Sequence, residues 1–286
     1  MFNIIEKRNI LFAIPCVIIL VGIICFFAFD GLNTDIDFTG GTAMEVELGE
    51  SFDEEKIRDI FDTIDGVSVS TVQSSGSQKA IIKTTEISSD KLAEVKDAIE
   101  AAFPASNIIS TDSVSATMGN EMWWSAAKAV VIAVLLMLAY IWIRFELFSG
   151  ISAVLALCHD VLVIISIYAI FQLPLNTTFI AAVLTILGYS INATIVVFDR
   201  IRENVKTIRK SSFADVVNTS IWQTLGRSIN TSVTTLLTLV CLYVLGVTSI
   251  KQFILPIIIG IVCGSYSSIF IAGQFWVLFK GKNAQH

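Results

Sequence analysis

Long apolar runs alternate with polar segments along this chain, and six of the runs are long enough to cross a membrane. They cover residues 9–29, 123–143, 149–171, 177–198, 228–247 and 253–279, to within a few residues. A helix of about 20 apolar residues spans the hydrocarbon layer of a bilayer. Only a short turn at 172–176 separates the third run from the fourth. The pattern therefore predicts a polytopic α-helical membrane protein with six transmembrane helices.

The segment between the first and second runs has shorter periods, which are typical of a small α+β domain. Alternating positions predict strands at 42–48, 67–72, 79–85 and 108–114, and helical spacing predicts helices at 54–64 and 92–102. Pro104 ends the second of these helices because its ring cannot continue one. The order β-α-β-β-α-β predicts a ferredoxin-like domain after the first transmembrane helix.

Charge divides the chain into two faces. Basic residues lie beside the expected spans at positions 7, 8, 144, 200, 202, 206, 209, 210, 280 and 282. All of them fall on one side if the chain crosses six times, and Lys and Arg are enriched in cytoplasmic loops. We therefore expect both termini in the cytoplasm and residues 30–122 on the outer face. This outer segment has 19 acidic and 6 basic residues, which argues against nucleic-acid binding.

These boundaries divide the chain into four expected parts. They are an N-terminal cytoplasmic segment with the first transmembrane helix at 1–29, an external ferredoxin-like domain at 30–122, a five-helix transmembrane bundle at 123–279 with a cytoplasmic loop at about 199–227, and a cytoplasmic tail at 280–286. The basic start of the first run is also compatible with a signal peptide. Its length and the lack of a small-residue cleavage site favour a retained helix.

Composition and motifs narrow the possible chemistry. The residues are 54% hydrophobic and only 15% charged, whereas soluble domains have about 25% charged residues. The five cysteines all lie in expected spans, at spacings that match no metal site. No phosphate-binding loop, H-E-x-x-H or G-x-S-x-G motif occurs. We therefore expect no cofactor, no metal and no enzymatic activity.

Asp160 is the one acid well inside an expected span, about 11 residues from its start. Charged groups at membrane depth are costly and commonly functional. The carboxylate can serve as a proton acceptor or as a structural hydrogen-bond partner of a neighbouring helix. His159 precedes it, but adjacent residues on a helix point about 100° apart, so the two side chains need not touch. We take Asp160 and His159 as ion-path candidates.

The fourth and fifth runs carry further polar groups at membrane depth. Asn192 lies about seven residues before the end of the fourth run, and Arg227 lies at the start of the fifth. The two spans run antiparallel, so Asn192 and Arg227 can meet if the helices pack, and both are ion-path candidates. The alternative is structural, since small polar residues are common packing groups of membrane helices and arginine can extend to the interface.

Charged and amphipathic segments follow the fourth run. Residues 199–204 can continue the helix with ion pairs at i,i+3 and i,i+4, and Arg200 can anchor it at the interface. Apolar residues at 213, 216, 217, 221 and 225 predict an amphipathic helix that lies on the membrane surface.

A short acidic and glycine-rich segment joins the first span to the first strand. Asp35 and Asp37 precede Gly40 and Gly41. Paired carboxylates before such a turn can bind a cation. The alternative, which the residue chemistry favours, is a tight connector in which both glycines take positive φ.

Four motifs, in order, resemble the signatures of the SecF branch of the SecD/SecF family, within the resistance-nodulation-division superfamily. They are IDFTGG at 36–41, ALCHD at 156–160, GYSINATIVVFDRIREN at 188–204 and RSINTSVTT at 227–235. The resemblance covers almost the whole chain. The motif residues that it marks are Asp37, Gly40, Gly41, Gly188, Tyr189, Asp199 and Arg200.

The resemblance implies an accessory subunit of the Sec preprotein translocase in the bacterial cytoplasmic membrane. Such a subunit acts with SecD, here a separate chain, beside the SecYEG channel and the SecA motor. The pair uses the proton-motive force to promote late-stage export of the translocating preprotein. This subunit contacts membrane lipid and uses no ATP. The same resemblance implies that an acid matching position 193 and an arginine matching Arg227 form part of the proton path.

This chain departs from the family at that position, because it has Ala193 where the family usually has an aspartate. Alanine can neither accept a proton nor pair with Arg227. Three explanations stay open. Protons can be carried by Asp160 and by acids of SecD, or the coupling of export to the ion gradient can be weak or use another ion. Alternatively, the sequence was altered at position 193. Two rival functions also stay open: a structural subunit that stabilises SecD, and a small-molecule efflux transporter of the same superfamily.

Overall fold

The computed structural model describes residues 3–74, 78–144, 146–208 and 211–281. The chain forms two compact units. The helical unit contains Met1–Asn33, Ala129–Pro174 and Thr178–His286, and the α+β unit contains Thr34–Lys128 and Leu175–Thr177. The basic residues Arg209 and Lys210, and all but the first two residues of the expected tail at 280–286, lie outside the described residues.

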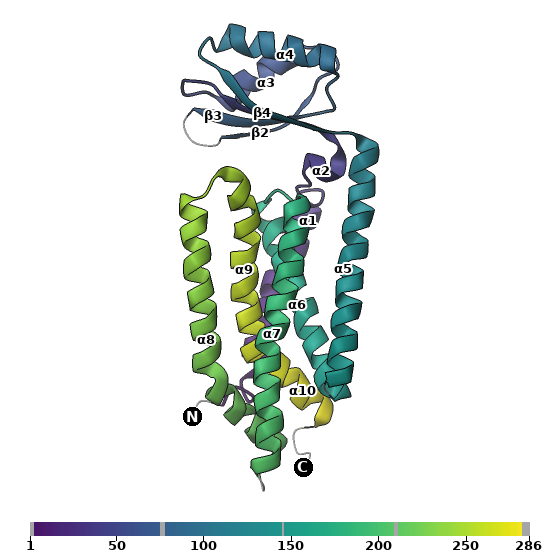
Figure 1. Ribbon diagram of the computed structural model, residues 1–286, viewed down its shortest axis with the longest axis vertical. Helices are drawn as coiled ribbons and strands as arrows, with labels where there is room; N and C mark the ends of the chain where they lie inside the picture. Colours follow the sequence, from purple (N-terminus) through teal and green to yellow (C-terminus); the bar gives the residue numbers. More distant parts are fainter. Residues whose placement is uncertain (1–2, 75–77, 145, 209–210, 282–286) are drawn as a thin grey trace. The chain divides into compact units, whose positions relative to one another are not determined.

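Six helical stretches of the described chain are long and apolar enough to cross a membrane, which confirms the predicted spans. Their helices are α1 (Arg8–Ala28), α5 (Ala116–Arg144), α6 (Leu147–Phe171), α7 (Thr177–Thr207), α8 (Phe213–Leu245), and α9 (Thr248–Phe270) with α10 (Ala272–Lys280), as Figure 1 shows. The sixth stretch is interrupted at Ile271, between α9 and α10. The protein is therefore a multi-pass membrane protein.

The buried positions of the helical unit are concentrated on α6, α7, α9 and α10. Small residues let these helices approach their neighbours closely, as is common in membranes. Gly22 of α1 lies directly against Ser166 of α6, where an added methyl group would overlap the serine side chain. At the other end of the unit, the Trp276 ring of α10 lies 4.9 Å from the ring of Phe198 in α7.

The prediction of a surface-lying helix at 213–225 is wrong. Residues Phe213–Leu245 form one continuous helix, α8. The apolar residues Phe213, Val216 and Val217 are completely buried in the protein, and the Phe213 ring lies 5.5 Å from that of Trp276. The apolar stripe that suggested a membrane surface is instead covered by α10.

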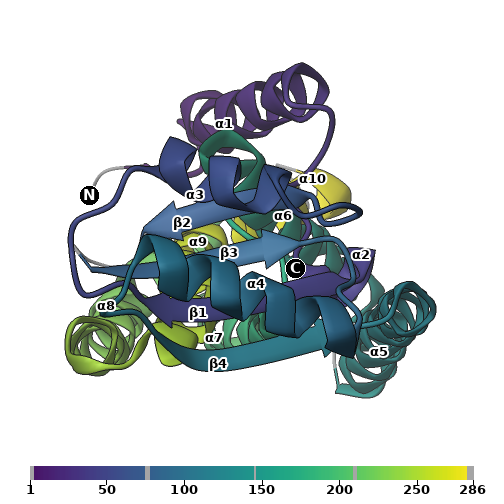
Figure 2. The same cartoon turned by 90° about the horizontal axis from the view of Figure 1, so that it is seen from above.

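The α+β unit has the predicted order of strands and helices. Its elements are α2 (Ile36–Thr39), β1 (Gly41–Glu47), α3 (Glu54–Asp62), β2 (Val69–Ser74), β3 (Lys79–Thr84), α4 (Ser89–Ala102) and β4 (Asn107–Val114). The strands form an antiparallel sheet in the order β2-β3-β1-β4, the order of a ferredoxin-like fold. The helices α3 and α4 cover the same face of the sheet (Figure 2). The core between them contains Met44, Val46, Phe61, Ile82 and Val95.

Candidate functional site

The Asp160 carboxylate joins three helices inside the membrane-spanning unit. Asp160 lies on α6 and is fully buried. Its Oδ2 accepts hydrogen bonds from the Ser190 hydroxyl of α7 at 2.5 Å and from the Ser267 hydroxyl of α9 at 2.9 Å. Its Oδ1 lies 3.0 Å from Nδ1 of His159. The Asp160 side chain of α6 thus links its own helix to both α7 and α9.

Close packing of α7 and α9 brings the two serines to this carboxylate. Gly260 of α9 lies against Ile186 of α7, and four residues later Gly264 lies against Ser190, where an added Cβ would be 2.9 Å from the serine Cβ. This G-x-x-x-G spacing places both glycines on one face of α9, so the two backbones can approach. The Ser190 and Ser267 side chains consequently point at the same oxygen.

His159 contacts Asp160 although the two residues are adjacent on α6. Its imidazole is 13% exposed, and Nδ1 makes the 3.0 Å contact with the carboxylate. Its Nε2 is buried and has no hydrogen-bond partner among the described residues. When Nδ1 carries the proton and donates to Asp160, Nε2 is a free acceptor. The pair therefore offers a second position for a proton beside the carboxylate.

The contacts of Asp160 depend on its protonation state. An ionised carboxylate is only an acceptor, and the two hydroxyls and the imidazole supply three matching donors. A protonated carboxyl group carries a donor on one oxygen, so the partner of that oxygen has to turn, to find another acceptor or, in the case of His159, to change tautomer. Binding of one proton can therefore alter contacts among α6, α7 and α9.

The other two ion-path candidates, Asn192 and Arg227, make no polar side-chain contact with Asp160 in the described structure. Asn192 and Arg227 are both exposed on their helices, and neither side chain makes a polar contact with the described part of the chain. The two helices contact each other elsewhere, where the Tyr189 hydroxyl lies 3.4 Å from that of Ser232. The predicted meeting of Asn192 with Arg227 does not occur in this structure.

Ala193 is half-buried on α7, three residues after Ser190. Residues three apart on a helix lie on nearly the same face. An acid at position 193 would therefore extend from the side of α7 that carries the Ser190 contact with Asp160. In this chain, that side has a methyl group at position 193 and leaves Asp160 as the buried acid of the arrangement.

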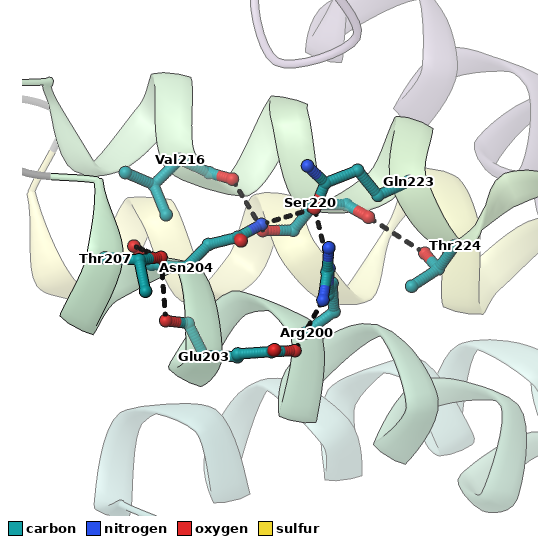
Figure 3. A network of polar contacts seen from close by, with 8 residues as sticks. All are labelled: Arg200, Glu203, Asn204, Thr207, Val216, Ser220, Gln223 and Thr224. Atoms are coloured by element: carbon teal, nitrogen blue, oxygen red, sulfur yellow. Dashed lines mark hydrogen bonds and ion pairs between the residues drawn. The ribbon is translucent and has the colours of Figure 1, made fainter.

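A polar network joins the ends of α7 and α8 (Figure 3). Arg200 Nε donates to Gln223 Oε1 at 2.6 Å, and its Nη1 contacts Glu203 at 2.6 Å. Asn204 donates to Ser220 at 2.8 Å and to the same Gln223 oxygen at 2.7 Å. Arg200 is thus part of a connection between helices, and the predicted i,i+3 ion pair is present.

Asp199 and Gly188 complete the motif residues of α7. Asp199 Oδ1 lies 3.6 Å from the guanidinium of Arg202, a second i,i+3 pair. Gly188 is exposed, and an added Cβ there would meet nothing within 4 Å. Nothing in the structure explains why glycine stands at this position.

The acidic segment before β1 forms a connector in which protein groups contact both carboxylates. Asp35 forms an ion pair with Lys83 at 2.9 Å, and both side chains are about 10% exposed. Asp37 accepts hydrogen bonds from the Thr177 backbone N–H at 2.8 Å and from its hydroxyl at 2.6 Å. Gly40 and Gly41 have φ values of 76° and 138°, as predicted for the turn. These contacts favour the connector over a cation site.

Sequence reasoning missed two parts of this arrangement. Ser267 was not identified as a partner of Asp160, although it belongs to a run of small and hydroxyl residues at 264–268. The G-x-x-x-G spacing at Gly260 and Gly264 is the signal that could have found the α7–α9 approach. The network of Asn204 with Ser220 and Gln223 had no comparable signal, because its members lie on separate helices.

Comparisons with known proteins agree on one family. Residues 94–282 match the family described as "Protein export membrane protein SecD/SecF, C-terminal". The chain is 38% identical to protein translocase subunit SecF of Acidaminococcus fermentans, over 98% of each chain. It is 36% identical to protein translocase subunit SecDF of Bacillus subtilis, over 97% of this chain and 38% of the relative.

A solved structure has the same fold over almost the whole chain. The crystal structure of SecDF from Thermus thermophilus, described as a translocon-associated membrane protein, superposes with a TM-score of 0.88 at 32% identity. The similarity covers 98% of this chain and 38% of the SecDF chain. The present chain therefore spans well under half the length of these SecDF proteins and nearly all of the SecF relative.

Proposed function

The chain belongs to the SecD/SecF family of protein-export membrane proteins, and we propose that its buried carboxylate couples proton movement to polypeptide export. Its SecF relatives are named protein translocase subunits, and the role proposed for this chain in the translocase is an accessory one. The single observation that supports proton coupling is Asp160, a fully buried acid with hydrogen-bonded partners on α7 and α9. An acid in this position is costly within a membrane, which makes a functional role the default interpretation.

The coupling mechanism follows from the contacts of Asp160. Protonation at Oδ2 turns the acceptor shared by the Ser190 and Ser267 hydroxyls into a donor, so one hydroxyl has to turn and the contacts of α7 and α9 change. Protonation at Oδ1 is instead accommodated by a change of tautomer in His159. Return of the carboxylate to the ionised state restores the contacts. His159 takes up or passes on the proton through Nε2, which has no hydrogen-bond partner in the described part of the chain. Repeated proton transfer then alternates two arrangements of α6, α7 and α9.

SecD is the proposed direct partner. Relatives that carry the two names in one chain, SecDF, support a joint action of the two parts. The SecYEG channel, the SecA motor and the translocating preprotein are the proposed partners during export. The chain acts there as a translocase subunit rather than as an enzyme, and it requires no cofactor.

The charge distribution supports one orientation in the bacterial cytoplasmic membrane. From the basic residues beside α1, α7 and α10 we infer that the two termini lie in the cytoplasm. The acidic α+β unit then lies on the outer face, where an exported polypeptide emerges. A cysteine introduced in this unit would be labelled from outside intact cells by an impermeant reagent, and labelling only after lysis would contradict the orientation.

Ala193 shifts the proton path toward Asp160 and toward acids of SecD. Arg227 and Asn192, which are exposed here, face SecD or lipid in the assembled translocase. An Ala193→Asp variant is expected to assemble normally and to increase the dependence of export on the proton gradient. A failure of this variant to bind SecD would mean that position 193 has repacked around alanine.

The test is preprotein release from proteoliposomes that contain this chain with SecD, SecYEG and SecA. Asp160→Asn is expected to abolish the increase in release that an imposed proton gradient produces. Asp62→Asn, the same substitution at an exposed position of α3, is the matched control and should behave as the wild type. Undiminished gradient-dependent release in Asp160→Asn would remove Asp160 from the mechanism.

The two rival functions make different predictions in the same assay. A purely structural subunit would stabilise SecD without any effect of Asp160→Asn on the gradient response. A small-molecule efflux transporter would lower substrate accumulation in cells without any effect on preprotein release. The family match favours export, because the reported relatives are translocase subunits.

A further inference from the structure

An apolar crevice of about 510 Å³ lies between α5 and α6 in the helical unit. Its lining includes Leu135 and Ala139 of α5 and Leu147, Ile151 and Leu155 of α6. Glu146, at the start of α6, is the one charged side chain among the described lining residues. Cavities of this size are large enough to enclose an organic ligand.

The crevice arises because the two helices approach closely at one level and leave space at another. Gly150 of α6 lies against Ile141 of α5, with an added Cβ placed 3.2 Å from the isoleucine side chain. Ile141 is accordingly buried, whereas Leu135 is 58% exposed and Leu147 is 64% exposed. The crevice is therefore open to its surroundings along the exposed leucines.

The surroundings of this opening are the acyl chains of the bilayer, because both helices are membrane spans. Along α6 the lining extends over nine residues, from Leu147 to Leu155, whose ends are about 12 Å apart at the rise of an α-helix. An occupant must be apolar over this length, since the described lining residues offer no polar side chain there. It must also tolerate a carboxylate at one end, where Glu146 lies.

Charge complementarity at this end selects among lipids. Glu146 is exposed and has no described ion-pair partner, so a nearby ammonium group is favoured and a second anion is disfavoured. Phosphatidylethanolamine combines an apolar acyl chain with an ammonium headgroup, whereas phosphatidylglycerol carries a net negative charge. The lining thus matches the first lipid better than the second.

We infer that the α5–α6 crevice is a binding site for one phospholipid, with an acyl chain between the helices and an ammonium headgroup beside Glu146. The bound chain fills the space that the helices leave beyond the Ile141–Gly150 contact. It thereby holds α5, which has few buried residues, against the rest of the helical unit. This site is separate from Asp160 and does not depend on proton coupling.

The test is native mass spectrometry of the full chain, purified in mild detergent and offered the two lipids in equal amounts. The wild type is expected to retain one phospholipid, with phosphatidylethanolamine in several-fold excess. Ala139→Trp, which fills the crevice, should reduce retention several-fold. Ala133→Trp makes the same change on α5 at a position outside the lining and should retain lipid like the wild type.

A second variant keeps the proposal testable if Ala139→Trp does not fold. Glu146→Gln leaves the apolar lining intact and should retain a lipid while losing the preference for phosphatidylethanolamine. Equal retention by Ala139→Trp, Ala133→Trp and the wild type would overturn the site. An unchanged headgroup preference in Glu146→Gln would overturn the placement of the ammonium group.

Discussion

Replacing Asp160 with either asparagine or alanine separates its structural contribution from its capacity to bind a proton. Asparagine has nearly the same shape, and its carbonyl can still accept from the Ser190 and Ser267 hydroxyls. Its amide group can donate to Nδ1 of His159 once the imidazole takes the other tautomer. All three contacts can thus persist without a titratable carboxyl group. Alanine removes all three.

The expected magnitudes follow from these contacts. Hydrogen bonds between membrane helices contribute about 0.6 kcal/mol each on average, so loss of the Ser190 and Ser267 contacts should lower the free energy of unfolding by about 1.2 kcal/mol. Loss of the His159 contact within α6 adds to this value. Asp160→Ala should show this loss, whereas Asp160→Asn should stay within about 0.6 kcal/mol of the wild type, the value of one such contact. The serine and histidine groups left unpaired by alanine add to the difference.

Unfolding in mixed micelles with increasing denaturing detergent, followed by circular dichroism, measures both values. Asp160→Ala is expected to be clearly less stable than Asp160→Asn. Equal stabilities of the two variants would show that the Ser190, Ser267 and His159 contacts do not stabilise the bundle.

Three further predictions concern other parts of the helical unit. Ala193→Asp should retain binding to SecD and increase the gradient dependence of preprotein release, as measured by co-purification and by the proteoliposome assay. Gly22→Ala should lower the free energy of unfolding by about 1–3 kcal/mol, because the added methyl overlaps Ser166, whereas Gly226→Ala, with nothing within 4 Å, should not destabilise. Asn204→Ala removes two hydrogen bonds to α8 and should lower the free energy of unfolding by about 1–3 kcal/mol; no change in detergent unfolding would mean that the network is not stabilising.

Most of the fold follows from periodicity because each element has a local cause. Apolar runs of membrane length predict the spans, and alternation with helical spacing predicts the ferredoxin-like order of 42–114. The start of α8 was predicted wrongly for a physical reason. An amphipathic face looks the same whether it is covered by lipid or by protein, and only the tertiary structure shows that Trp276 covers Phe213.

The site was predictable only in part. Asp160 is evident from sequence because an acid in an apolar run is conspicuous. Its partners are not evident, since Ser190 and Ser267 lie 30 and 107 residues away and are joined to it by helix packing. Conversely, the depth of Asn192 and Arg227 in antiparallel spans predicts that these two side chains can meet each other. Their side chains nevertheless lie on exposed faces, which depth alone does not reveal.

The proposed coupling requires that Asp160 itself gains and loses a proton inside the assembled translocase. Infrared difference spectroscopy of the reconstituted complex with SecD and SecYEG, recorded before and after a proton gradient is imposed, measures this directly. Proton uptake by Asp160 should give a protonated-carboxyl band that appears with the gradient in the wild type and is absent or reduced in Asp160→Asn. An identical carboxyl band in both complexes would contradict it, because the proton would then be bound elsewhere.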